Sequence, residues 1–109
     1  MNLYKLHTNK EELFGYEHYD GLIWNSEKSV INDDVTVYWN ALGHLSRKDG
    51  PAKINYKNGE LRAQTWYKDG KRHRADGPAL VVTNGRREYW YEGQYYKNMH
   101  LMQTQNELI

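Results

Sequence analysis

The chain of 109 residues has no cysteine, only two prolines and a single phenylalanine. The lack of cysteine excludes a disulfide framework, cysteine-ligated zinc and thiol chemistry, so any catalysis would depend on histidine, carboxylate or hydroxyl groups. No apolar run approaches the roughly 18 residues that a membrane-spanning helix needs. Residues 1–10 also lack the apolar core of a signal peptide. We therefore expect a soluble cytoplasmic protein with no membrane partner.

Aromatic residues stand out in a chain that is otherwise polar. Hydrophobic residues make up 39% and the mean hydropathy is −1.02, yet 14% of the residues are aromatic, including ten tyrosines and four tryptophans. Disordered chains are poor in aromatic residues, so the composition indicates a folded protein. A chain of this length buries one modest core, which predicts a single small domain.

The net charge of +1 hides a gradient along the chain. Residues 1–46 carry three basic and seven acidic side chains, a net charge of −4, whereas residues 47–109 carry twelve basic and seven acidic ones, a net charge of +5. Two interpretations stay open. Either the charges cover the solvated face of a sheet, or the C-terminal half presents a basic surface to an anionic partner.

An internal repeat organises the second half of the sequence. The tetrapeptide Asp-Gly-Pro-Ala occurs at residues 49–52 and again at 76–79, 27 residues later. Trp39 and Trp66 have the same separation, and Trp90 opens a shorter third copy. The structural repeat positions are Trp39, Trp66, Trp90, Asp49, Gly50, Pro51, Asp76, Gly77 and Pro78. We expect the three tryptophans to form a ladder on neighbouring units.

Turn signals divide each unit into β-hairpins. The dipeptides at residues 58–59, 69–70 and 84–85 are Asn-Gly or Asp-Gly, which accept the positive φ angles of a type I′ turn. Gly43 and Gly93 mark two further turns. Between turns, side chains alternate with the period of a strand, and large ones fall on both faces. The expected fold is therefore mainly all-β: a single-layer antiparallel β-meander of hairpin repeats, with a short N-terminal helix or loop cap.

The Asp-Gly-Pro-Ala segments are interpreted as corners between hairpins. Proline supplies no hydrogen-bond donor to a sheet, and a glycine before it permits a sharp change of direction where a strand begins. Arg47 and Asp49 lie two residues apart, as do Arg74 and Asp76, so each pair is close enough to form an ion pair.

The stretch from Trp66 to Ala79, Trp-Tyr-Lys-Asp-Gly-Lys-Arg-His-Arg-Ala-Asp-Gly-Pro-Ala, resembles the MORN-like β-hairpin repeats of uncharacterised phage and large-virus proteins. The resemblance covers about residues 33–98 and departs at Ser46, where the pattern has histidine, as at His73. It implies a meander used as a binding scaffold and implies no reaction. By analogy with small phage proteins, it also implies a protein that binds and blocks or redirects a host protein, such as a defence system.

The chain is expected to divide into three parts. Residues 1–32 form a cap packed on the sheet, residues 33–98 form the meander, and residues 99–109 form a last strand or a tail. Residues 8–11 fit a capping box, which predicts a short helix over residues 9–14.

Candidate catalytic and metal-ligating residues are sparse. The five histidines include no pair at helical spacing and no His-x-His, so we predict no metal site. The adjacent carboxylates at residues 11–12 and 33–34 diverge in direction and fall where caps and turns favour acids. No glycine-rich loop introduces a helix, which leaves nucleotide phosphates without a cradle. We predict a protein that is not an enzyme and has no cofactor.

Protein binding is the leading functional hypothesis. Tyrosine, tryptophan and arginine are enriched at interface hot spots, and a sheet of one layer cannot bury all of them. The partner, a host or cognate protein, is expected to contact bulky residues that the units do not share, because shared residues hold the hairpins. These are Arg62, Tyr67, Arg72, His73, Arg87, Tyr89 and Tyr91. A homodimer stays an alternative.

Single-stranded nucleic-acid binding is the second hypothesis. Basic residues between positions 62 and 87 are interspersed with aromatic ones, and stacking combined with phosphate contacts is how single strands are held. The repeat alone explains Trp66 and Trp90, and the pI of about 7.9 is low for such a role. A structural or virion-associated role is the third hypothesis.

Overall fold

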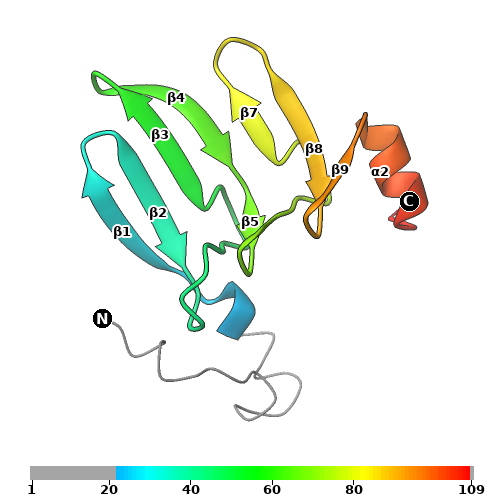
Figure 1. The fold of residues 1–109 in the computed structure, drawn as a ribbon, viewed down its shortest axis with the longest axis horizontal. Helices are drawn as coiled ribbons and strands as arrows, with labels where there is room; N and C mark the ends of the chain where they lie inside the picture. Colours follow the sequence, from blue (N-terminus) through cyan, green and yellow to red (C-terminus); the bar gives the residue numbers. More distant parts are fainter. Residues whose placement is uncertain (1–21, 109) are drawn as a thin grey trace.

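The computed structural model describes residues 22–108, which form an antiparallel sheet of seven strands, a separate two-stranded hairpin and a C-terminal helix (Figure 1). The elements are β1 (Glu27–Asn32), β2 (Val35–Trp39), β3 (Lys53–Lys57), β4 (Glu60–Thr65), β5 (Tyr67–Lys68), β6 (Lys71–Arg72), β7 (Leu80–Val82), β8 (Arg87–Tyr91), β9 (Gln94–Tyr96) and α2 (Met99–Gln105). The sheet order is β1-β2-β3-β4-β7-β8-β9, and β5 pairs with β6. The extents of 42 × 39 × 17 Å are those of a flat molecule. The predicted all-β meander is confirmed.

The turns lie at the two ends of the strands, as Figure 1 shows. The turns at residues 58–59, 69–70 and 92–93 have positive φ at both central residues, as a type I′ turn requires. The turn at residues 84–85 differs from the prediction, because only Gly85 has positive φ. There the Val82 N–H bonds to the Arg86 carbonyl at 2.9 Å, which closes a three-residue loop.

The sheet begins earlier than the sequence indicated. Residues 27–32, assigned above to the N-terminal cap, form the edge strand β1, which pairs with β2 from Glu27 opposite Trp39 to Asn32 opposite Val35. Indole Nε1 of Trp39 donates to Ser29 Oγ at 2.8 Å across this pair. β1 is almost wholly exposed, so it carries no apolar alternation from which a strand could have been predicted.

The C-terminal segment is a helix and not the expected strand or tail. α2 lies beside β8 and β9 (Figure 1). The Asn98 side chain accepts a hydrogen bond from the Leu101 N–H at 2.9 Å and so caps the helix. Met102 is completely buried. The signal for this helix was an N-cap asparagine followed by one buried residue, which is too little to define a helical face.

The three repeat tryptophans do not form one ladder. Val37 and Thr65 are both paired with Lys53, on opposite sides of β3, and residues paired in this way lie on the same face. Trp39 therefore shares a face with Thr65, whereas Trp66 follows Thr65 and lies on the other face. Thr65 is paired with Leu80 and Leu80 with Glu88, so these three residues lie on one face. Trp90 follows Glu88 by two residues and therefore lies on this face, as Trp39 does. In the face of the sheet on which it lies, Trp66 corresponds to Tyr38 and not to Trp39.

Two buried polar side chains position the segment that precedes β1. Asn40 and Ser46 are completely buried, and both donate to the Ile23 carbonyl, from Asn40 Nδ2 at 3.1 Å and from Ser46 Oγ at 2.5 Å. Ala41 N–H donates to the Leu22 carbonyl at 3.1 Å. These bonds fix the place of Trp24. The helix expected over residues 9–14 lies outside the described residues.

Candidate interaction groove

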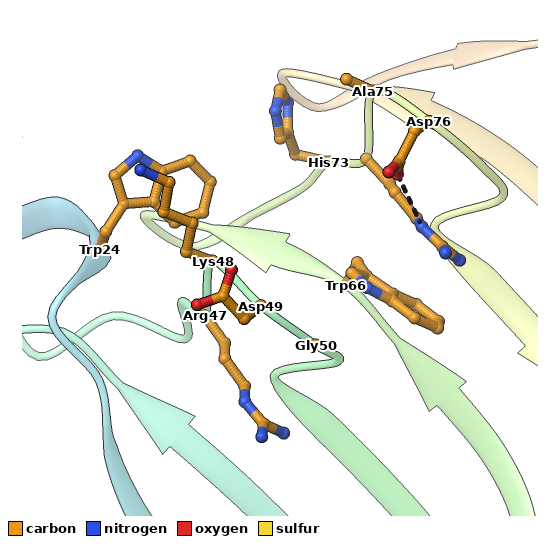
Figure 2. A pocket seen from close by; sticks show the side chains of 10 residues that line it. Trp24, Arg47, Lys48, Asp49, Gly50, Trp66, His73, Ala75 and Asp76 are labelled. Carbon is orange, nitrogen blue, oxygen red and sulfur yellow. Dashed lines mark hydrogen bonds and ion pairs between the residues drawn. The ribbon is translucent and has the colours of Figure 1, made fainter.

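A groove with a volume of about 570 Å³ lies between the two Asp-Gly-Pro-Ala corners (Figure 2). One wall is residues 47–50, the other is residues 73–76, and Trp66 and Trp24 complete the lining. We call this the corner groove. Its volume falls in the range of sites that hold a small molecule or a few side chains.

In the second corner, Arg74 is held between an aromatic ring and a glycine. Its guanidinium carbon lies 4.0 Å from the centre of the Trp66 ring. Its Nη1 donates to the Pro78 carbonyl at 3.1 Å, and its Nε donates to Asp76 at 3.2 Å. A Cβ at Gly77 would lie 2.8 Å from the same guanidinium carbon. The arginine thus has one fixed position, set by the ring on one side and the backbone on the other.

The first corner repeats this arrangement with a different ring. The guanidinium carbon of Arg47 lies 3.8 Å from the centre of the Tyr38 ring, and Nη1 donates to the Pro51 carbonyl at 3.2 Å. A Cβ at Gly50 would lie 3.0 Å from that carbon. Neither corner glycine has a positive φ. The glycine is therefore required for space beside the arginine, and not for the change of chain direction that the sequence suggested.

The two corners differ in their ion pairs. Arg74 pairs with Asp76, as predicted. The second predicted pair is absent, because in the described part of the chain no carboxylate lies within 4.0 Å of Arg47 or of its neighbour Lys48. Figure 2 shows the guanidinium of Arg47 extending away from the carboxylate of Asp49. Among residues 22–108, the two cations on one wall of the corner groove therefore have no ion-pair partner.

His73, at the other wall, is packed and neutral. Its side chain is 10% exposed, and its ring centre lies 4.5 Å from that of Tyr91. Its Nδ1 accepts a hydrogen bond from the Glu92 N–H at 2.9 Å. Burial lowers the pKa of His73 below its usual value of 6.5; the carboxylate of Glu92 raises this pKa and the ammonium of Lys68 lowers it further. A histidine held in this way contributes no positive charge to the groove at neutral pH.

The seven residues predicted to contact a partner do not form one surface. His73 and Tyr91 touch each other beside the groove. Arg72 lies over Trp90, with 5.2 Å between guanidinium carbon and ring centre, on the face opposite to Arg87 and Tyr89. Arg62 is exposed where the register of β4 shifts, and Tyr67 is half-buried in β5.

Arg72 is engaged with other side chains of the chain. Its Nη1 lies 3.4 Å from Glu88, which also accepts from Trp90 Nε1 at 3.0 Å. The Trp90 bond, followed by the bond from Arg86, lowers the pKa of Glu88. This cluster of charges and rings holds β6 against β8.

Sequence reasoning missed the main lining residues of the groove. Arg47, Arg74 and Trp66 occupy shared positions that the repeat explains as structural, and Trp24 falls in the segment predicted to form the cap. The signal available was an arginine repeated three residues before each Gly-Pro pair, downstream of an aromatic residue. The spacing from ring to arginine is nine residues in one unit and eight in the other, which concealed the correspondence.

Two other polar arrangements bear on possible chemistry: a metal-binding cluster and a histidine beside a hydroxyl. Residues 22–108 contain no group of three or more histidine, aspartate or glutamate side chains that could hold a metal ion. His44 Nδ1 lies 2.8 Å from Asp69 Oδ1. The nearby hydroxyl of Ser46 is completely buried and donates to the Ile23 carbonyl, so it is not directed at His44 as a nucleophile would be.

Comparison of the chain with protein-family models, with curated proteins and with solved structures gives no match. Among the helical segments within residues 22–108, none has the length and apolar character needed to cross a membrane.

Proposed function

We propose that the chain is a non-enzymatic protein-binding module that holds a segment of its partner in the corner groove. The observation that carries this proposal is the lining of the groove, where two tryptophans and two arginines face a common space. These are residue types that dominate binding energy at protein interfaces.

The rigidity of the lining supports the proposal. Arg47 and Arg74 are each fixed by a ring and by a proline carbonyl before any partner arrives. Side chains that are already ordered lose little conformational entropy on binding, whereas each flexible one costs about 0.5–1.5 kcal/mol. The groove therefore combines the composition of a hot spot with a preorganised shape.

The charge arrangement favours a protein over a single-stranded nucleic acid. Three arginines of the basic C-terminal half already face carboxylates: Arg72 with Glu88, Arg74 with Asp76, and Arg86 with Glu88. A phosphate backbone would have to compete with these carboxylates for each cation. Nucleic-acid binding is retained as the alternative that the experiment below separates.

The identity of the partner rests on the resemblance to small phage proteins. On that basis the proposal is that the chain acts in the cytoplasm of a host cell, where it blocks or redirects a host protein. A structural or virion-associated role would instead require a partner from the virus itself.

Capture from a host lysate on the immobilised chain tests the proposal. Lys48→Glu reverses an exposed charge in the groove, and Lys57→Glu makes the same change at the distant end of β3. We expect Lys57→Glu to capture the same protein as the unaltered chain and Lys48→Glu to capture clearly less. Equal capture by both variants would place the interface elsewhere, and capture that disappears after nuclease treatment would favour the nucleic-acid alternative.

A further inference from the structure

The two walls of the corner groove have different charge states. On one wall, Arg74 is neutralised by Asp76 at 3.2 Å. On the other, neither Arg47 nor Lys48 has a carboxylate within ion-pair distance in the part of the chain that the structure describes. The two corners otherwise make the same stacking and carbonyl contacts. The difference is therefore an excess of positive charge on the wall of residues 47–48.

The unpaired arginine is oriented by its other contacts. Tyr38 covers one face of the Arg47 guanidinium, Gly50 approaches the other, and only Nη1 is bonded to the Pro51 carbonyl. Its Nε and Nη2 have no acceptor in the described chain. A planar guanidinium with an unused edge is suited to the two oxygens of a carboxylate. In the second corner the corresponding Nε is already bonded to Asp76.

Apolar surface adjoins this cationic wall. Trp66 and Trp24 line the same groove. The nearby Lys68 adds no uncompensated charge, because its Nζ is paired with Glu92 at 3.0 Å. Asp49 also lines the groove and reduces its overall positive charge, but it pairs with neither cation. The favoured ligand therefore has one carboxylate and an apolar neighbour, and is not a polyanion.

We propose, on the basis of the protein-binding function above, that the corner groove recognises an acidic segment of the partner protein. An aspartate or glutamate carboxylate of that segment binds the unused edge of Arg47, and Lys48, whose side chain extends in the opposite direction (Figure 2), adds a second positive charge to the same wall. Neighbouring aromatic or aliphatic side chains of the segment pack against Trp66 and Trp24, which lie on opposite sides of the groove (Figure 2). The carboxylate supplies to the first corner the anion that Asp76 supplies to the second.

Selection of a random dodecapeptide library on the intact chain tests this inference. We expect the selected peptides to contain aspartate or glutamate next to an aromatic or aliphatic residue. Replacing that acid by its amide should weaken binding about tenfold or more, since hydrogen bonds between charged groups contribute about 1.5–3 kcal/mol. Lys48→Gln removes one exposed positive charge from the wall and should weaken binding by at most about fivefold, since exposed charge pairs contribute about 0.2–1 kcal/mol.

Arg47→Gln and Arg74→Gln form a matched pair of variants. Both lose the stacked guanidinium and the bond to a proline carbonyl, but only Arg47→Gln removes the arginine that lacks a carboxylate. We expect Arg47→Gln to weaken peptide binding at least tenfold more than Arg74→Gln does. Because Lys48→Gln leaves the corner contacts intact, it keeps the test valid even if an arginine variant fails to fold.

Each contrary outcome has a distinct meaning. Two results would overturn the acidic-segment inference but support protein binding. One is a set of selected peptides without a preference for acids. The other is peptides that bind Arg47→Gln and Lys48→Gln as tightly as the unaltered chain. Recovery of no peptide, or binding restricted to phosphorylated peptides or oligonucleotides, would also overturn the inference. In those cases the lysate capture with Lys48→Glu and Lys57→Glu still decides the proposed function separately.

Discussion

Nδ1 of His73 accepts a hydrogen bond of 2.9 Å from the backbone N–H of Glu92, the first central residue of a type I′ turn. The first unit has the same connection in another form, because Oγ of Ser46 accepts from the backbone N–H of Asp69 at 3.1 Å. Both side chains tie a corner to the turn of the next hairpin. Ser46 in the first unit and His73 in the second therefore make the same hydrogen bond with different acceptor groups.

Burial of the His73 imidazole makes the stability of the fold dependent on pH. Nδ1 can accept the hydrogen bond from the Glu92 N–H only while it carries no proton, and burial lowers the pKa of His73 in the folded state. Between the folded pKa and the usual value of 6.5, the unfolded chain binds more protons than the folded chain, so stability decreases as the pH falls through this window. The contribution is complete above 6.5 and is constant again below the folded pKa.

Urea unfolding between pH 7.5 and pH 5 measures this effect, with His73→Asn as the control because an amide accepts the same bond without titrating. We expect the variant to have a flatter pH dependence than the unaltered chain, and NMR titration of the His73 ring to give a pKa below 6.5. Identical slopes for the two proteins would show that His73 is not the titrating group.

Asn40 is the second test of the hydrogen-bond framework. Its buried amide accepts from the N–H groups of Leu42 and His44 at 2.9 and 3.0 Å and donates to Ile23 and Asp69 at 3.1 and 3.0 Å. Asn40→Asp removes both donors and places a second carboxylate beside Asp69. We expect a loss of about 3 kcal/mol or more, as for a buried charge without compensation.

Asn58→Asp is the matched control for this change, because Asn58 is exposed in a turn with positive φ that aspartate also tolerates, as Asp69 does. We expect its stability to stay within about 0.5 kcal/mol of the unaltered chain. Urea unfolding of the two variants gives the comparison. Equal losses would mean that the Asn40 hydrogen bonds do not stabilise the fold.

Gly77 provides a test of the corner geometry. Because its φ is not positive, alanine suits the backbone, but its Cβ would displace the Arg74 guanidinium at 2.8 Å. We expect Gly77→Ala to cost about 2–4 kcal/mol, the sum of a cation–π contact and a charged hydrogen bond. In an Arg74→Ala background the same change should cost nothing, since the space is then empty and alanine restricts the unfolded chain.

A double-mutant cycle by urea unfolding measures this coupling between Gly77 and Arg74. Additive effects of the two changes would show that the glycine is needed for a backbone reason and not to make room for the arginine. Gly50→Ala should show the same kind of coupling with Arg47, but a smaller one, because the added Cβ would lie 3.0 Å from the guanidinium carbon of Arg47.

Local signals in the sequence were sufficient for the fold class and insufficient for the groove. Turn dipeptides and strand alternation act over a few residues, so the antiparallel meander and glycine turns such as Gly59 and Gly70 follow from them. β1 could not be recognised because an exposed edge strand has no buried face to create a pattern. The partner of each corner arginine depends on the register between distant strands, which the one-residue difference in spacing obscured.

The face assignment of Trp66 leads to the last prediction. Because Trp66 corresponds to Tyr38, which supports Arg47 in the first corner, a tyrosine at position 66 should support Arg74 in the same way. We expect Trp66→Tyr to cost less than about 1.5 kcal/mol, in the range of conservative core changes. Trp66→Ala should cost about 3 kcal/mol, because the half-buried ring and the stacked arginine are both lost. Denaturant unfolding of the two variants measures both values. If the tyrosine variant were as unstable as the alanine variant, then a specific packing of the indole, and not an aromatic support for Arg74, would be what position 66 requires.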